Sequence, residues 1–192
     1  MARRAFVAKS YDHYYGSGLY DARYPRPNPP TYRRALRLAS AASRILDFGA
    51  GSGRYTLPLL DSTDAFLCAY DISVDACKTL KAHASAAGVR SQRLLVTPDL
   101  DAARAAGPYD LALSLFGVLS HIEAPEDRMK ILNSIFACLR PVACFLSRCR
   151  TRFAASRCMH RKFIMTAKQL YAFLPGVYAP LLPLAAPGRL SS

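Results

Sequence analysis

The sequence predicts an α/β fold with a doubly wound, mostly parallel sheet. Short, continuously apolar segments alternate along the chain with stretches that have helical periodicity. Continuously apolar strands are typical of a parallel sheet that is covered by helices on both faces, and right-handed crossovers then wind the sheet in both directions. Ligands of such sheets bind at the carboxyl ends of the strands, so functional residues are expected there.

The expected elements follow one another in a regular order. Strands are expected at residues 44–48, 65–70, 93–97, 109–115 and 142–147. Helices are expected at residues 31–42, 74–87 and 126–139. Pro125 suits the first turn of the last of these helices, because proline is well tolerated where no N–H is needed.

The length of 192 residues fits one domain with a substantial core. Three regions are distinguished by composition. Residues 1–28 form an extension rich in tyrosine, residues 29–148 carry the α/β pattern, and residues 149–192 form a basic, proline-rich tail. We expect the central region to bind the ligand and the extension to act as a lid.

The net charge of +13 is unevenly distributed. Residues 128–192 hold 11 of the 26 Lys and Arg residues and none of the 13 Asp and Glu residues. Such asymmetry is found in tails that contact nucleic acid or anionic lipid. A divergent or mis-framed end is the alternative, because these basic residues are scattered among apolar ones.

The six cysteines predict no metal site. None of them forms a C-x-x-C pair, which structural zinc sites usually contain, and the set Cys144, Cys149, Cys158 and His160 fits no familiar ligand spacing. Buried, reduced thiols are expected instead. The start of the chain lacks the apolar stretch of a secretory signal, and four prolines between residues 169 and 188 argue against a membrane helix. The expected location is therefore the cytoplasm.

A glycine-rich loop directly follows the first expected strand. It reads Asp47-Phe48-Gly49-Ala50-Gly51-Ser52-Gly53, and a helical stretch comes next. Glycines allow positive φ angles and close approach of a ligand, and the following helix start offers unpaired N–H groups. A dinucleotide fingerprint would need glycine at position 54 or 56, where Arg54 and Thr56 stand, and no P-loop lysine follows. An NAD(P)-dependent oxidoreductase is therefore disfavoured.

With these motifs the sequence resembles the class I S-adenosylmethionine-dependent methyltransferases. Residues 45–55 look like the first motif of that family, and Asp71 ends the second strand twenty residues after Gly51. The segment 109–117 is similar to the fourth-strand motif, and residues 139–141 to the turn before the fifth strand. The resemblance covers about residues 40–147, with its parts in the family's order, and implies a Rossmann-like methyltransferase fold.

The resemblance implies S-adenosyl-L-methionine as the cofactor. Asp71 would accept hydrogen bonds from the ribose hydroxyls, and Asp99 would face the adenine amino group. The implied cofactor-binding residues are Asp47, Gly49, Ala50, Gly51, Gly53, Asp71, Ile72, Asp99, Leu100 and Ser114. Two structural alternatives stay open, since Asp71 could only cap the helix that begins near Ser73, and Asp99 could only cap a turn.

His121 is the candidate catalytic base. It follows the fourth expected strand, where the substrate of this family approaches, and histidine side chains titrate near neutrality. The alternative is a histidine at a helix start with no catalytic role. No Asn/Asp-Pro-Pro-Tyr signature occurs at residues 114–117, which argues against an adenine-N6 acceptor.

The methyl acceptor is expected to be a small molecule, with a tRNA base as the rival. The aromatic extension favours the former and the arginine-rich tail the latter. The tail also departs from the family: Val142 and Ala143 replace the usual Gly-Gly, and residues 149–192 show no clear strand pair for the usual C-terminal hairpin. Either this hairpin is disguised in the sequence, or the sheet stops near five strands. A catalytically impaired or non-catalytic protein that binds the cofactor is therefore the alternative function.

Overall fold

The computed structural model describes residues 11–122, 124–148 and 162–166, and it shows six strands in one sheet. The strand order is β3-β2-β1-β4-β5-β6. The strands are β1 (Arg44–Phe48), β2 (Phe66–Tyr70), β3 (Leu94–Thr97), β4 (Tyr109–Ser114), β5 (Leu139–Arg148) and β6 (Lys162–Thr166). Strands β1 to β5 are mutually parallel, and β6 pairs with β5 in the antiparallel direction. The doubly wound, mostly parallel sheet is confirmed.

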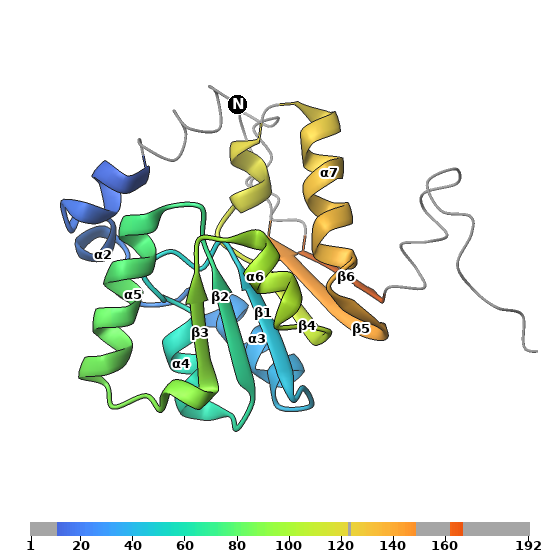
Figure 1. Ribbon diagram of the computed structural model, residues 1–192, viewed down its shortest axis with the longest axis horizontal. Helices are drawn as coiled ribbons and strands as arrows, with labels where there is room; N and C mark the ends of the chain where they lie inside the picture. Colours follow the sequence, from blue (N-terminus) through green and yellow to red (C-terminus); the bar gives the residue numbers. More distant parts are fainter. Residues whose placement is uncertain (1–10, 123, 149–161, 167–192) are drawn as a thin grey trace, which may run out of the picture.

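Helices cover both faces of this sheet (Figure 1). The α-helices of the described residues are α2 (Leu19–Arg23), α3 (Pro29–Ala39), α4 (Thr56–Ser62), α5 (Val74–Ala86), α6 (Leu100–Ala105) and α7 (Pro125–Phe136). Two short 3-10 helices are η1 (Ser91–Arg93) and η2 (Val118–His121). Residues 11–16 are also helical.

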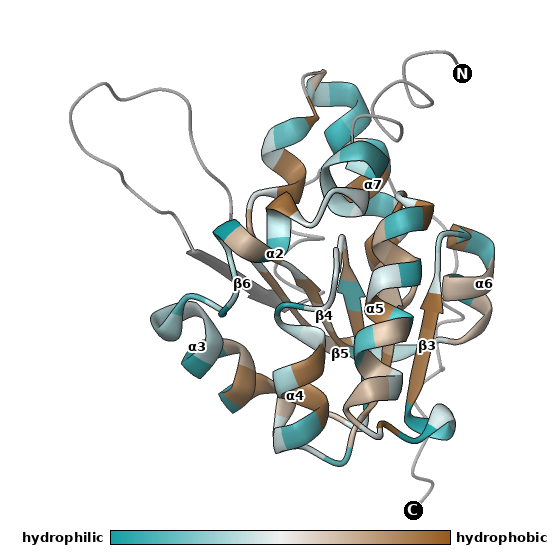
Figure 2. Cartoon of the chain, turned by 90° about the vertical axis from the view of Figure 1, so that its left-hand side faces the viewer, coloured by the Kyte–Doolittle hydropathy of each residue, from teal (hydrophilic) through white to brown (hydrophobic). Residues whose placement is uncertain are grey.

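Alternation along each strand decides which helices pack on which face. Ile45 of β1 lies in a buried cluster with residues of α3 and α4, whereas its neighbour Leu46 lies in a cluster with residues of α6 and α7. Helix α5 packs on β2 and β3 through Leu80. Figure 2 shows that strand β3 is mostly hydrophobic, whereas helices such as α5 carry both hydrophilic and hydrophobic residues. Successive residues of the central strands β1 and β4 are buried, so helices cover both faces of these strands, as the continuous apolar segments predict.

The helix starts are set by local capping. The Asn28 side chain accepts a hydrogen bond from the Thr31 N–H at 3.2 Å, and Pro29 occupies the first position of α3. The Ser73 hydroxyl accepts from the Ala76 N–H at 3.1 Å at the start of α5. These caps begin both helices within two residues of where the sequence pattern places them.

At the end of the sheet one expectation was wrong, and one open alternative is decided. The fifth strand begins at Leu139, so the helix expected at 126–139 ends earlier, at Phe136. The tail also contributes a strand, because residues 162–166 pair antiparallel with β5, with Phe145 opposite Met165. Of the two alternatives for the tail, the structure thus has a sixth strand that the sequence disguises, and not a sheet that stops near five strands. The other residues of the tail lie outside the described residues.

No helix of the described residues is long and apolar enough to cross a membrane. Cys68, Cys77 and Cys138 are buried and free, as expected of thiols that act as small hydrophobes, whereas Cys144 is free but only half-buried. Cys149 and Cys158 lie outside the described residues.

Candidate functional site

The glycine loop lies between β1 and α4, at the carboxyl end of the central strand. Gly49, Gly51 and Gly53 have φ angles of 81°, 58° and 96°, all in the left-handed region that side chains disfavour. A Cβ on Gly51 would lie 2.5 Å from the Tyr15 hydroxyl, and one on Gly49 or Gly53 would collide with Val118 or Leu80. Glycine is thus required at these positions both for backbone conformation and for space.

Asp47 joins the two ends of this loop. Its carboxylate is buried and accepts a hydrogen bond from the Thr56 hydroxyl at 2.7 Å, so the end of β1 is tied to the first turn of α4. Burial raises the pKa of Asp47 to about 6, while the Thr56 hydrogen bond lowers it and the Asp71 charge raises it further. In this structure Asp47 acts on the loop through Thr56.

Asp71 is held directly against the loop. Its Oδ2 accepts from the Gly51 N–H at 2.8 Å, and its Oδ1 accepts from the Ser73 N–H at 2.9 Å. Burial raises the pKa of this carboxyl, the two N–H groups lower it, and the Asp12 charge raises it. Each carboxylate oxygen has a second lone pair, so both can still accept a hydrogen bond from a ligand. The structure therefore brings Gly51 and Asp71, which are twenty residues apart in the sequence, into direct contact.

Asp99 and Leu100, which were expected to contact the adenine of the cofactor, form the start of helix α6. Asp99 is exposed and caps α6 by accepting from the Asp101 N–H at 2.9 Å, which is the capping role that the sequence left open. Leu100 is half-buried and packs against the core cluster under α6. Ile72 is half-buried beside Asp71, and Ala50 is buried within the loop.

Ser114 and His121 lie at and beyond the end of β4. The Ser114 side chain is fully buried, and its hydroxyl has no hydrogen-bond partner among the described residues. His121 ends η2 and is exposed, and its ring meets the Tyr11 ring edge-on at 5.8 Å between centroids. The candidate base therefore touches the aromatic extension.

The aromatic extension folds over the loop. Asp12 accepts from the Ser73 hydroxyl at 2.5 Å, and Asp21 accepts from the Ser52 hydroxyl. In Figure 1 the extension, in dark blue, lies beside the start of α5. A buried cluster forms there from Tyr15, Tyr20 and Ala76, with Tyr11, Tyr14, Tyr24 and Phe116 packed around it. The extension thus covers the face of the loop on which a ligand would lie.

Tyr15 and Tyr20 are the most enclosed rings of this cluster, with centroids 4.6 Å apart. Burial strongly raises the pKa of Tyr15, and the charges of Tyr20 and Asp71 add to this. Burial raises the pKa of Tyr20 to about 12, although the charge of Arg54 lowers it. Both phenols are therefore neutral near neutral pH and act as hydrogen-bonding groups.

Three residues near the loop were missed by sequence reasoning: Tyr15, Arg54 and Phe116. The run of tyrosines was a signal for the first, but the contact of Tyr15 with Gly51 spans 36 positions and is set by packing. Phe116 has a φ angle of 61°, which is rare for a bulky residue and has no sequence signature.

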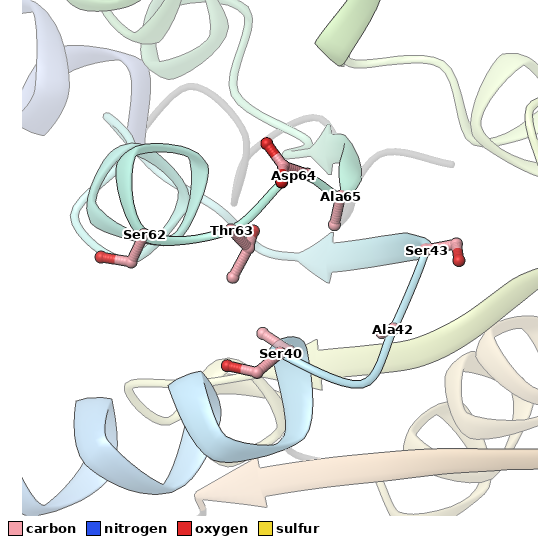
Figure 3. Close-up of a pocket in the computed structure, with 8 residues that line it drawn as sticks. Ser40, Ala42, Ser43, Ser62, Thr63, Asp64 and Ala65 are labelled. Atoms are coloured by element: carbon pink, nitrogen blue, oxygen red, sulfur yellow. The ribbon is translucent and has the colours of Figure 1, made fainter.

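A pocket of about 370 Å³ lies at the opposite end of the strands (Figure 3). It is formed where α3 runs into β1 and α4 runs into β2. Its lining residues are Ala39, Ser40, Ala42, Ser43, Ser62, Thr63, Asp64 and Ala65. None of the candidate site residues lines this pocket.

Comparison with known proteins points to one family. A family model described as "Methyltransferase domain" matches residues 46–145, more than half of the 192 residues. The match begins in β1 and ends in β5, and it includes the glycine loop and Asp71. A comparison with curated protein sequences finds no match.

Several solved structures have the same fold. The magnesium protoporphyrin IX methyltransferase of Synechocystis, solved with bound SAM, is 16% identical with a TM-score of 0.60, covering 81% of this chain and 80% of that one. The CcbJ methyltransferase of Streptomyces caelestis is 20% identical with a TM-score of 0.54, covering 65% and 54%. A SAM-dependent methyltransferase from Thiobacillus denitrificans, in complex with S-adenosyl-L-homocysteine, is 19% identical with a TM-score of 0.50, covering 63% and 48%. The chain thus spans about half the length of the last two structures.

Proposed function

Because the chain belongs to the methyltransferase-domain family, we propose that it is an S-adenosylmethionine-dependent methyltransferase that holds its cofactor on the loop of residues 49–53. The observation that carries this proposal is the hydrogen bond from the Gly51 N–H to Asp71, which sets a buried carboxylate beside a glycine surface. Two of the solved structures with this fold are described with S-adenosylmethionine or S-adenosylhomocysteine bound.

The residues of the site suit this cofactor. The remaining lone pairs of Asp71 would accept from the ribose hydroxyls. The Tyr15 hydroxyl occupies the space where a Cβ of Gly51 would lie, so the Tyr15 ring would have to move for the cofactor to approach the backbone there. The hydroxyl of Ser114 is fully buried without a partner among the described residues, so its expected contact with the cofactor would require the residues that cover it to move. Asp99 and Leu100 at the start of α6 would contact the adenine ring of the cofactor.

The cofactor would supply an activated methyl group on a positively charged sulfur. The protein then has to orient the acceptor in line with that methyl group and to exclude water. The ring cluster of residues 11–24 would perform the second task, since it already covers the loop. If the acceptor must lose a proton, His121 would receive it on a ring nitrogen.

We propose a small molecule as the methyl acceptor. The aromatic cluster beside His121 offers flat, apolar surfaces with hydroxyl groups at their edges, which suits a small ring-containing acceptor. A tRNA base is the rival, and phosphate contacts would make its affinity fall steeply with salt. Titration with tRNA at increasing salt concentration separates the two, because a small acceptor gives no such dependence. The cytoplasmic location expected from the sequence stays a prediction.

The experiment that tests the function has two stages. Calorimetry with S-adenosylhomocysteine should show one-site binding to the wild type and weaker binding to Asp71→Ala. A methyl-release assay over a panel of small acceptors should then show turnover that His121→Ala reduces. Binding without turnover on any acceptor would instead support the non-catalytic alternative, and absence of binding would contradict both.

A further inference from the structure

The first helix of the extension, residues 11–16, covers the two groups that the cofactor would have to reach. A Cβ on Gly51 would lie 2.5 Å from the Tyr15 hydroxyl, so this phenol rests against the backbone of the glycine loop. Asp71 is only 8% exposed, and besides burial its charge raises the pKa of both Tyr11 and Tyr15, as expected of rings that lie beside it. A ligand the size of a nucleoside therefore has no path to the loop backbone or to Asp71 while this helix keeps its position.

The first helix is held down by side-chain contacts. Asp12 accepts a hydrogen bond from the Ser73 hydroxyl at 2.5 Å and a longer one from the Asp75 N–H at 3.4 Å. The Tyr15 ring packs on the Tyr20 ring, with 4.6 Å between their centroids. Contacts of this kind can be exchanged for contacts with water or with a ligand, and the sheet stays intact when they break.

A short glycine-containing turn joins the first helix to α2. Gly16, Ser17 and Gly18 are all exposed, and the Gly18 N–H donates to the Tyr15 carbonyl at 3.0 Å, which ends the helix. Gly18 has a φ angle of 70°, and a Cβ at this position would have no atom within 4 Å. Its left-handed conformation therefore serves the turn itself, and glycine can leave that conformation at little cost. Moving segments commonly rotate about a few residues of this kind.

Helix α2, on the other side of the turn, is fastened to the site by contacts of its own. Asp21 accepts from the Ser52 hydroxyl of the glycine loop. Tyr20 is buried, and the ring of Tyr24, which follows α2, packs on Phe116 with 4.6 Å between the centroids. The extension thus has an anchored half and a half that is attached through the turn of residues 16–18.

We propose that residues 11–16 are a gate that turns about residues 16–18 and admits the ligand only when it is open, which rests on the proposed function for the identity of the ligand. In the closed position Tyr15 occupies the surface of Gly51 and blocks entry. After entry the gate returns over the bound ligand, with Tyr15 displaced from Gly51. The gate then slows both entry and release, so that loss of the whole extension lowers affinity because release accelerates more than entry.

The test measures ligand entry in variants of the turn and of the gate. S-adenosylhomocysteine is mixed rapidly with the wild type, Gly18→Ala and Tyr15→Ala, and tyrosine fluorescence is followed because the chain has 11 Tyr and no Trp. Gly88→Ala is the matched control, since its φ angle of 68° and its free surroundings match those of Gly18. Thermal unfolding checks that each variant keeps its fold. Hydrogen exchange of residues 11–16 measures opening of the gate without any ligand.

The wild-type rate should level off at high ligand concentration, because opening of the gate then limits entry. Gly18→Ala strains the closed position, since a side chain in the left-handed region disfavours that position by roughly fivefold to thirtyfold. Entry at low ligand concentration should accelerate by that factor. Tyr15→Ala removes the obstruction, so its rate should rise linearly with ligand concentration. Gly88→Ala should behave as the wild type.

Entry rates of Gly18→Ala and Tyr15→Ala equal to that of the wild type would show that nothing has to open, and the proposal would be wrong. If the wild type binds no S-adenosyl compound, the proposed function fails, and hydrogen exchange still tests the gate. Faster exchange of residues 11–16 in Gly18→Ala than in Gly88→Ala would then support the gate. Equal exchange in the two variants would contradict it.

Discussion

The backbone N–H of Gly51 donates to the Asp71 carboxylate at 2.8 Å, and this bond joins the carboxyl ends of β1 and β2. Its length and burial fix the loop relative to the second strand before any ligand arrives. Asp71 therefore has two tasks, since it shapes the loop and would also bind the ribose.

Asp71→Ala should weaken S-adenosylhomocysteine binding by about 1.5–3 kcal/mol, because it removes a charged acceptor from the proposed ribose site. Calorimetry measures this loss. Asp61→Ala is the control, since Asp61 is an exposed carboxylate of α4. Equal affinity of the Asp71 variant and the wild type would show that the ligand lies elsewhere.

Gly51→Ala should abolish binding and lower the stability of the fold. The new Cβ would lie 2.5 Å from the Tyr15 hydroxyl, in a backbone conformation that costs a side chain roughly 1–2 kcal/mol. Gly88→Ala is a matched control, because its φ angle of 68° carries the same backbone cost while its Cβ would have no atom within 4 Å. Chemical unfolding and calorimetry compare the two variants. Similar effects of both substitutions would mean that space at Gly51 is unimportant.

Removal of residues 1–24 should reduce both cofactor affinity and turnover, because the tyrosine cluster covers the loop and keeps water out. Binding of S-adenosylhomocysteine and methyl release are measured on the shortened chain. Its thermal unfolding is followed in parallel to confirm that the sheet is kept. A shortened chain with the affinity and turnover of the full chain would exclude the lid.

Asp47 should make the free energy of unfolding fall as the pH rises from about 4 to about 6. Its folded pKa of about 6 lies above the ordinary value of 3.8, so the unfolded state releases its proton first and gains stability over this interval. The change is on the order of 2–3 kcal/mol, complete above pH 6. Asp71 contributes in the same direction, since its pKa is also raised.

Asp47→Asn isolates this effect, because asparagine keeps an acceptor for Thr56 and does not titrate. Urea unfolding at a series of pH values gives the difference between the wild type and the variant. The variant should gain relative stability between pH 4 and pH 6. A difference that is constant over this range would mean that Asp47 is not buried as a charged group.

Local patterns were enough to predict the centre of this fold. The strands β1 to β4 are short apolar runs bounded by polar residues, and the loop carries its own glycines, so both could be identified without knowledge of the tertiary structure. Strand β6 could not be predicted in this way. It forms by pairing with β5, and the sequence of the tail has no alternating hydrophobic pattern that would indicate a strand. The strained Phe116 and the position of Arg54 depend on packing between distant segments.

The site shows the same division. Asp71 was predicted from its position after the second strand, and the structure places it on Gly51. Asp99 was predicted to contact the adenine. In the structure it caps helix α6, and its contact with the cofactor stays a prediction. Tyr15 could not be assigned, because nothing in a run of tyrosines tells which ring reaches the loop.

The most direct measurement is the mapping of backbone amide NMR shifts when S-adenosylhomocysteine is added. The expected result is that the largest shifts fall on Gly49, Gly51, Gly53 and Asp71, and that Arg54 moves with them. Shifts confined to the pocket at the other end of the strands, around Ser40, Ser43 and Thr63, would contradict the proposed cofactor site.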